Sequence, residues 1–179
     1  MLGLRIAHLT GLALAWGANC LAASGGAEAS SQLSCGPDLQ NNLIGRNGSI
    51  KSLEHLPASL QLKLLGASEL SDALYSQWFV ACGSEFMAIL DKKQSKIRDI
   101  IVIPEHSRQS PEFLGLCERQ GKETKYEIIA ILENNSSDQA MLPAKFAKIV
   151  NVDHAKFEDT PTDNLSCPRD NIFTEDSGK

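Results

Sequence analysis

Residues 78–103 read WFVACGSEFMAILDKKQSKIRDIIVI, and this stretch decides the class of fold that we expect. Short runs of aromatic and branched residues are separated by polar turns, which is the pattern of β-strands. The pattern predicts strands at 78–82, 86–91 and 97–103. The link between the last two strands has the length of a hairpin loop, so we expect them to pair antiparallel as part of a meander.

Further strands are predicted downstream of this stretch. Runs of the same composition occur at 125–133 and 146–153, with a further short strand expected at 155–158. Together with the first three, they predict one antiparallel sheet.

The segment before residue 77 has a helical pattern instead. Leu39, Leu43 and Ile44 fit a short amphipathic turn, and Pro57 suits the first turn of a helix over 57–65. Ser68 is expected to cap a second short helix that turns Leu70, Ala73 and Leu74 toward the core. The predicted fold class is therefore α+β, with N-terminal short helices followed by an antiparallel meander sheet of four to six strands and two disulfides.

The N-terminus resembles a secretory signal peptide. Arg5 precedes an apolar run from Leu9 to Leu21, which is too short to span a bilayer and is followed by small residues. Lipidation of Cys20 is an alternative, but Gly17 and Asn19 stand where a lipoprotein signal needs Leu and a small residue. The expected organisation is a signal peptide at 1–23, a flexible mature N-terminus at 24–34, a single α+β domain at 35–168 and a flexible tail at 169–179.

Cysteine usage supports export to the periplasm or the medium. Of the five cysteines, four lie beyond the signal peptide, and an even number in an exported domain predicts two disulfides. The pairing Cys35 with Cys82 and Cys117 with Cys167 is preferred, because each bond would tie a poorly structured end to the domain. The wide spacing argues against a zinc site and against a redox-active pair.

Charge excludes two classes of partner. The chain holds 17 Lys and Arg against 22 Asp and Glu, and it has no basic run of the kind that binds nucleic acid or anionic membranes. We expect no nucleic-acid partner and no transmembrane segment after cleavage of the signal peptide.

No catalytic, cofactor or metal motif is present in the sequence. His55, His106 and His154 have no second histidine at the spacing of a metal site, so they are predicted to be exposed histidines in turns. Ser107 and Ser110 are not part of a nucleophile elbow, and there is no phosphate-binding loop. The prediction is no catalytic residue, no cofactor and no metal.

The polar excursion from Pro104 to Lys125 is the segment most suited to contact a partner. It contains an apolar cluster, Phe113, Leu114 and Leu116, that strand periodicity does not explain. These three are the candidate partner-contact residues. The alternative is that Phe113 and Leu116 cap the sheet.

The leading functional hypothesis is a small exported, disulfide-stabilised binding domain, of the inhibitor or immunity type, that recognises a protein or an envelope component. The runner-up is a small exported hydrolase whose acid and base residues come together only in three dimensions. A structural or stress-related envelope protein is the third hypothesis.

Overall fold

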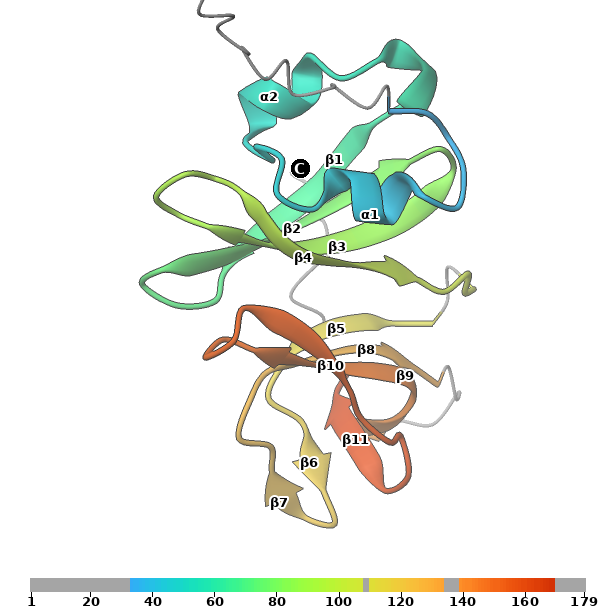
Figure 1. Ribbon diagram of the computed structural model, residues 1–179. Helices are drawn as coiled ribbons and strands as arrows, with labels where there is room; N and C mark the ends of the chain where they lie inside the picture. The colour runs from blue at the N-terminus through green and yellow to red at the C-terminus, as the bar shows by residue number, and fades with distance from the viewer. Residues whose placement is uncertain (1–32, 108–109, 134–138, 170–179) are drawn as a thin grey trace, which may run out of the picture. The chain divides into compact units, whose positions relative to one another are not determined.

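The computed structural model describes residues 33–107, 110–133 and 139–169, which form mostly antiparallel β-sheet with a few short helices (Figure 1). The expected signal peptide and nearly all of the expected C-terminal tail lie outside the described residues. The helices are α1 (Leu39–Leu43), α2 (Ile50–Glu54) and the 3-10 helix η1 (Ala58–Leu60). The strands are β1 (Lys63–Glu69), β2 (Leu74–Ala81), β3 (Ser84–Asp91), β4 (Ile97–Ile103), β5 (Glu112–Gly115), β6 (Glu118–Arg119), β7 (Lys122–Glu123), β8 (Ile128–Leu132), β9 (Met141–Asn151), β10 (Lys156–Asp159) and β11 (Leu165–Pro168).

The first sheet is an antiparallel meander in the order β1-β2-β3-β4. Its central hairpin, β2–β3, turns on Cys82 and Gly83 between the paired residues Ala81 and Ser84. Both turn residues have positive φ, 55° and 77°, which is the backbone that a two-residue hairpin requires. Gly83 adopts it without strain because it has no Cβ atom.

The second sheet has the order β5-β8-β9-β11-β6-β7, and β10 pairs with β9 off this path. β9 is long enough to pair with different partners along its length. Its first residues pair with β11, its last residues pair with β10, and β8 follows the other edge. In Figure 1, β6, β7 and β11 lie below β8 and β9.

Strand β3 is apolar on both faces because two different cores cover it. Phe86, Ala88 and Leu90 belong to a cluster beneath the helices, whereas Met87 and Ile89 belong to a cluster shared with the second sheet. Successive side chains of a strand point to opposite faces. The first sheet therefore lies between a helical layer and the second sheet.

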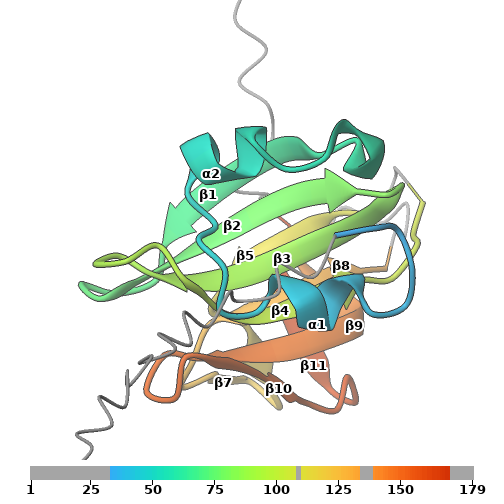
Figure 2. The same ribbon diagram turned by 45° about the horizontal axis from the view of Figure 1, so that its top comes forward.

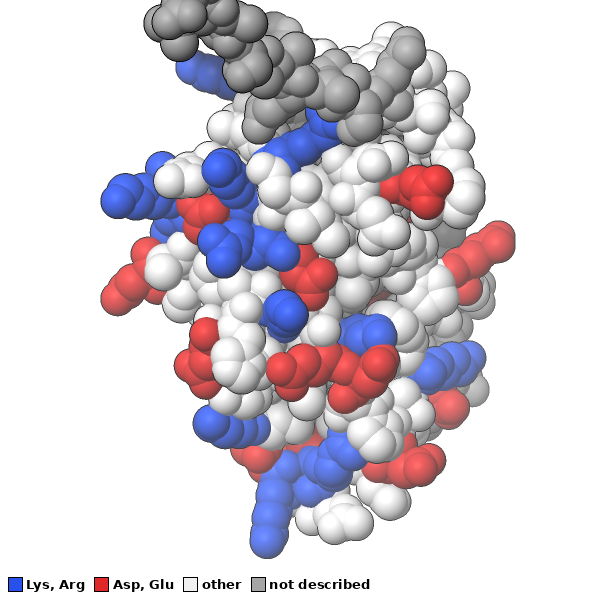
Figure 3. Space-filling view, in the orientation of Figure 1, with Lys and Arg blue, Asp and Glu red and all other residues white. Residues whose placement is uncertain are grey.

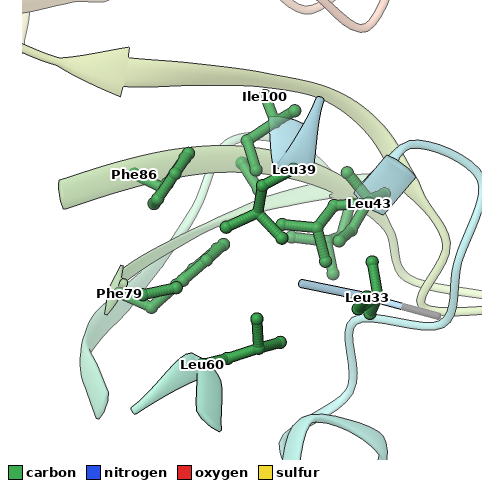
Figure 4. Close-up of a cluster of buried hydrophobic side chains, with 11 residues drawn as sticks. Leu33, Leu39, Leu43, Leu60, Phe79, Phe86 and Ile100 are labelled. Atoms are coloured by element: carbon green, nitrogen blue, oxygen red, sulfur yellow. The ribbon is translucent and has the colours of Figure 1, made fainter. Parts of the chain in front are cut away.

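The core beneath the helices contains residues from nearly every element of the N-terminal half. Figure 4 shows Leu39 and Leu43 of α1 and Leu60 of η1 directed toward Phe79 and the strands. Phe79 and Phe86 stack with ring centroids 5.5 Å apart. In Figure 2, α1 and α2 lie over the same face of the first sheet.

The core between the sheets is formed from alternate residues of both. Trp78 and Met87 of the first sheet pack in one cluster with Leu114, Ile129 and Val150 of the second. A hydrogen bond also joins the two sheets: the backbone N–H of Phe157 in β10 donates to the carboxylate of Asp99 in β4, at 2.8 Å.

Two of the predicted helices are wrong. Only 58–60 of the expected helix at 57–65 is helical, and the left-handed backbone of Gln61, with φ 48°, ends that turn. Leu64 then lies in β1, which gains its hydrogen bonds by pairing with β2. The expected helix after Ser68 is a tight turn in which the N–H of Leu70 donates to the carbonyl of Leu74.

The predicted single meander sheet describes only part of the structure, which has two sheets. The predicted strands at 78–82, 86–91 and 97–103 correspond to β2, β3 and β4. Strands β5, β6 and β7 occupy the segment that was expected to be a polar excursion, and they belong to a second sheet that the sequence analysis did not anticipate.

Candidate metal centre

Two glutamates face each other across the edge of the core between the sheets. Glu85 of β3 has the parity of Met87 and Ile89, so its side chain lies on the face that meets the second sheet. Glu112 of β5 has the parity of Leu114, so it lies on the opposing face. Both residues are half-buried.

His106 completes the cluster from the segment that links the two sheets. One ligand atom each from Glu85, His106 and Glu112 lie within 4.8 Å of one another. Nε2 of His106 is 2.5 Å from Oε1 of Glu112, and the two side chains are 14% and 22% exposed. Glu85 is distant from the other two residues in the sequence, but it pairs with Ile103 of β4, so His106 follows closely after the partner of Glu85 in the sheet.

The backbone fixes the tautomer of the histidine. Nδ1 of His106 is 2.9 Å from the carbonyl oxygen of Pro104. A carbonyl can only accept, so Nδ1 carries the proton and donates it. In a neutral ring this leaves the Nε2 lone pair directed at Glu112.

A lone pair and a carboxylate oxygen at this distance need a cation between them. Without a metal, that cation is a proton, and the environment of Glu112 favours its protonated carboxyl group. Burial, followed by the charge of Glu85, raises the pKa of Glu112 to about 7, although the neighbouring His106 acts in the opposite direction. The cluster therefore holds a proton at a point where a divalent cation would satisfy all three groups.

The donor set has the features of a metal site with open positions. A ligating histidine usually donates its other ring N–H to a carboxylate or a backbone carbonyl, as His106 does here. In a tetrahedral zinc site with metal–ligand distances of about 2.0–2.1 Å, the ligand atoms lie about 3.4 Å apart. The three ligand atoms lie within 4.8 Å of one another, so zinc binding requires the widest pair to close by up to about 1.4 Å.

No metal site is predicted from the sequence, and Glu85 and Glu112 are not among the candidate residues there. Paired ligands on one element mark a metal site in a sequence, whereas these donors come from a strand, a link and a strand of another sheet. His106 was predicted to be exposed, which is wrong because its side chain is largely covered. His55 and His154 are exposed, as predicted. Glu105, the acidic neighbour of His106 in the sequence, is exposed and takes no part in the cluster.

The four cysteines that were predicted to form disulfides lie outside the cluster of Glu85, His106 and Glu112. Cys35 is bonded to Cys82, with S–S 2.04 Å, and Cys117 to Cys167, with S–S 2.01 Å. These are the partners that the sequence analysis preferred. With all four in disulfides, none of these sulfurs is a thiolate that could bind a metal.

The three apolar residues proposed for partner contact are divided by the fold. Phe113 and Leu114 are 5% and 2% exposed and belong to two different cores, whereas Leu116 is 41% exposed. A contact role for Leu116 stays a prediction. The burial of Phe113 agrees with the alternative that it covers the sheet.

The surface charge is mixed in sign on one face of the molecule. Acidic and basic side chains are interspersed over the face shown in Figure 3. Within the described ranges, none of the helices has the length and apolar character needed to cross a membrane.

Comparison with known proteins gives no relative. No protein-family model matches the chain, and no curated protein or solved structure shows significant similarity to it.

Proposed function

We propose that this protein is an exported binding domain whose functional centre is a divalent-metal site formed by Glu85, His106 and Glu112. The observation that carries the proposal is the convergence of one imidazole nitrogen and two carboxylate groups within 4.8 Å. The orientation of His106 by the Pro104 carbonyl supports it. Export remains the expectation of the N-terminal sequence and of the two disulfides.

The chemistry of the donors favours zinc. Imidazole nitrogen with carboxylate oxygen is a common zinc ligand set, whereas calcium and magnesium prefer oxygen ligands alone. Copper(I) would want thiolate or thioether sulfur, and the donor set has neither. The ion would join β3 of the first sheet to β5 of the second.

The test is a zinc titration of the chelator-treated protein by isothermal calorimetry. We expect one Zn²⁺ per chain, with Ca²⁺ binding far more weakly. His106→Gln and Glu85→Gln should each weaken zinc binding by at least about tenfold. His154→Gln is the matched control, because His154 is exposed and lies outside the cluster.

A thermal shift gives an independent measurement of the same site. A ligand that binds only the folded state stabilises it by an amount that grows with its concentration. Zinc should therefore raise the Tm of the wild type and of His154→Gln, but not that of His106→Gln. Equal zinc affinity in wild type and His106→Gln, or no zinc binding, would refute the proposal.

A hydrolase is the second candidate function, favoured by one observation. Solvent reaches the side chains of His106 and Glu112, and the described residues supply three protein ligands, so a bound ion would keep a position for water. Catalytic zinc sites have this arrangement. Zinc-dependent hydrolysis of 4-nitrophenyl acetate that is lost in Glu85→Gln would support it, and binding of zinc without hydrolysis of this ester or of 4-nitrophenyl phosphate would favour the binding domain.

A further inference from the structure

A cavity lies on the face of the first sheet opposite to the metal cluster. It has a volume of about 370 Å³ and opens between the α2–η1 segment and strands β1 and β2. This volume falls within the range of small-molecule sites. Its walls are partly polar and partly apolar, and the apolar part includes Ile50, Leu53, Leu56, Leu62 and Leu64.

One buried polar side chain lines the cavity from the sheet. Gln77 of β2 is on the same face as Phe79, beneath the helices, and is 2% exposed. Its Nε2 has no hydrogen-bond partner among the described residues. Buried amide groups nearly always have a partner, and Gln77 is part of the cavity lining, so an acceptor that enters the cavity is the candidate partner of this amide.

The mouth of the cavity shows two features that select a ligand. Ile50 is 55% exposed and extends the apolar part of the wall toward solvent. Among the described residues that line the cavity, Glu54 alone is charged, and it is exposed. An anionic ligand would meet this carboxylate and find no cation in the lining to balance its charge.

We propose that this cavity binds a neutral small molecule that has an apolar body and a carbonyl or hydroxyl oxygen accepting a hydrogen bond from Gln77. The apolar body replaces water against the leucine walls, and the single oxygen satisfies the buried amide. The site is independent of the metal centre, since Gln77 and Glu85 lie on opposite faces of the sheet.

The experiment uses 2-heptanone as the neutral probe and heptanoate as the anionic one. Titration of the ¹⁵N-labelled protein, followed by NMR, should show saturable binding of 2-heptanone with a shift of the Gln77 side-chain amide resonance. Heptanoate should bind at least about tenfold more weakly, because the anion loses its hydration and faces Glu54.

Matched variants separate the amide from the apolar walls. Gln77→Met keeps an unbranched side chain of similar length but removes the donor, and it should weaken 2-heptanone binding by about tenfold. Gln61→Met, at an exposed glutamine in the same lining, should leave binding unchanged. Ala58→Trp, at the exposed mouth, should abolish binding while the Tm confirms that the fold is retained.

Three results would overturn the inference. They are the absence of saturable 2-heptanone binding, equal affinity in Gln77→Met and wild type, and shifts confined to residues outside the cavity. The wild-type spectrum decides the question even if a variant fails to fold.

Discussion

Gly48 lies where the segment between α1 and α2 crosses the β3–β4 hairpin. Its backbone N–H donates to the carbonyl of Ser95 at 2.7 Å. A Cβ atom at this position would lie 2.5 Å from Cδ2 of Leu90 and 2.8 Å from Cγ1 of Ile97. Both neighbours belong to the core beneath the helices and are nearly fully buried, so they have little room to move.

Gly48→Ala should therefore destabilise the protein by about 1–3 kcal/mol through overpacking. Denaturant unfolding with a two-state fit measures this loss. Gly36→Ala is the control, because a Cβ atom there would meet nothing within 4 Å. If the two variants had the same stability, the close approach at Gly48 would not exist in solution.

Glu127 provides a prediction about pH. Burial raises the pKa of its carboxyl group above the ordinary value. The folded state then holds the proton more tightly than the unfolded state, so stability is lost as the pH rises through the unfolded and then the folded pKa. The charge destabilises the folded protein above that window and has no effect below it.

Glu127→Gln should raise the Tm at pH 8 and leave it nearly unchanged at pH 3.5, measured by circular dichroism. The gain is small, because the side chain is partly exposed and solvent screens its charge. Glu123→Gln, at an exposed glutamate of β7, is the control for removal of one surface charge. A larger gain in acid than at pH 8 would contradict the stated direction of the pKa shift.

The candidate metal centre could not be predicted from the sequence, residue by residue. Glu85 and His106 are each ordinary in their local context, and neither has a partner at a spacing that marks a metal site. Their proximity depends on two sheets facing each other, a tertiary arrangement that periodicity does not encode. The disulfide pairing was easier to predict from the sequence, because four cysteines allow only three pairings.

At the scale of elements, strand β5 shows how a short strand joins two cores. Phe113 packs in the core of the second sheet, and its neighbour Leu114 packs in the core between the sheets. Leu116, directly after the strand, is exposed. The same apolar cluster thus contains two residues that stabilise the fold and one that faces solvent.

Phe113→Ala should cost about 3–5 kcal/mol of stability, because it leaves a cavity the size of the ring in a buried core. Leu116→Ala should change stability by less than about 0.5 kcal/mol, as is usual for exposed positions. Thermal and denaturant unfolding of the pair measure the difference. A nearly unchanged Tm in Phe113→Ala would restore that residue as a candidate for partner contact.

Strands with clear turns were predictable, and ambiguous apolar runs were not. The β3–β4 hairpin was predictable because two apolar runs flank a charged link of five residues, from Lys92 to Lys96. Strand β1 was mistaken for a helix, because Leu60 and Leu64 have a spacing that suits both structures. Only its pairing with β2 decides the outcome.

At the scale of the whole molecule, the two disulfides differ in accessibility. Cys35 is exposed and Cys82 is half-buried, whereas Cys117 and Cys167 are 1% and 0% exposed. The bonds close loops of similar length, with separations of 47 and 50 residues. Each should contribute roughly 3–4 kcal/mol in the chain-entropy model.

In the folded protein, the exposed disulfide Cys35–Cys82 should therefore be reduced before the buried disulfide Cys117–Cys167. Mild phosphine reductant without denaturant, followed by alkylation and mass spectrometry, should label Cys35 and Cys82 at least about tenfold faster than Cys117 and Cys167, because thiol chemistry depends on access. In denaturant, the two pairs should react at similar rates. Simultaneous reduction of both pairs in the folded state would contradict the burial of the second disulfide.

The placement of the disulfides also divides the chain in two. Cys35 and Cys82 both precede the link from Pro104 to Pro111, and Cys117 and Cys167 both follow it. One backbone cut within that link would leave two separate polypeptides, each closed by its own crosslink. Non-covalent contacts would then join them: apolar side chains of both sheets, the bond from Phe157 to Asp99, and the approach of Glu112 to Glu85. The junction between the sheets is thus physically a protein–protein interface within one chain, and the two halves are suited to a split-protein reporter.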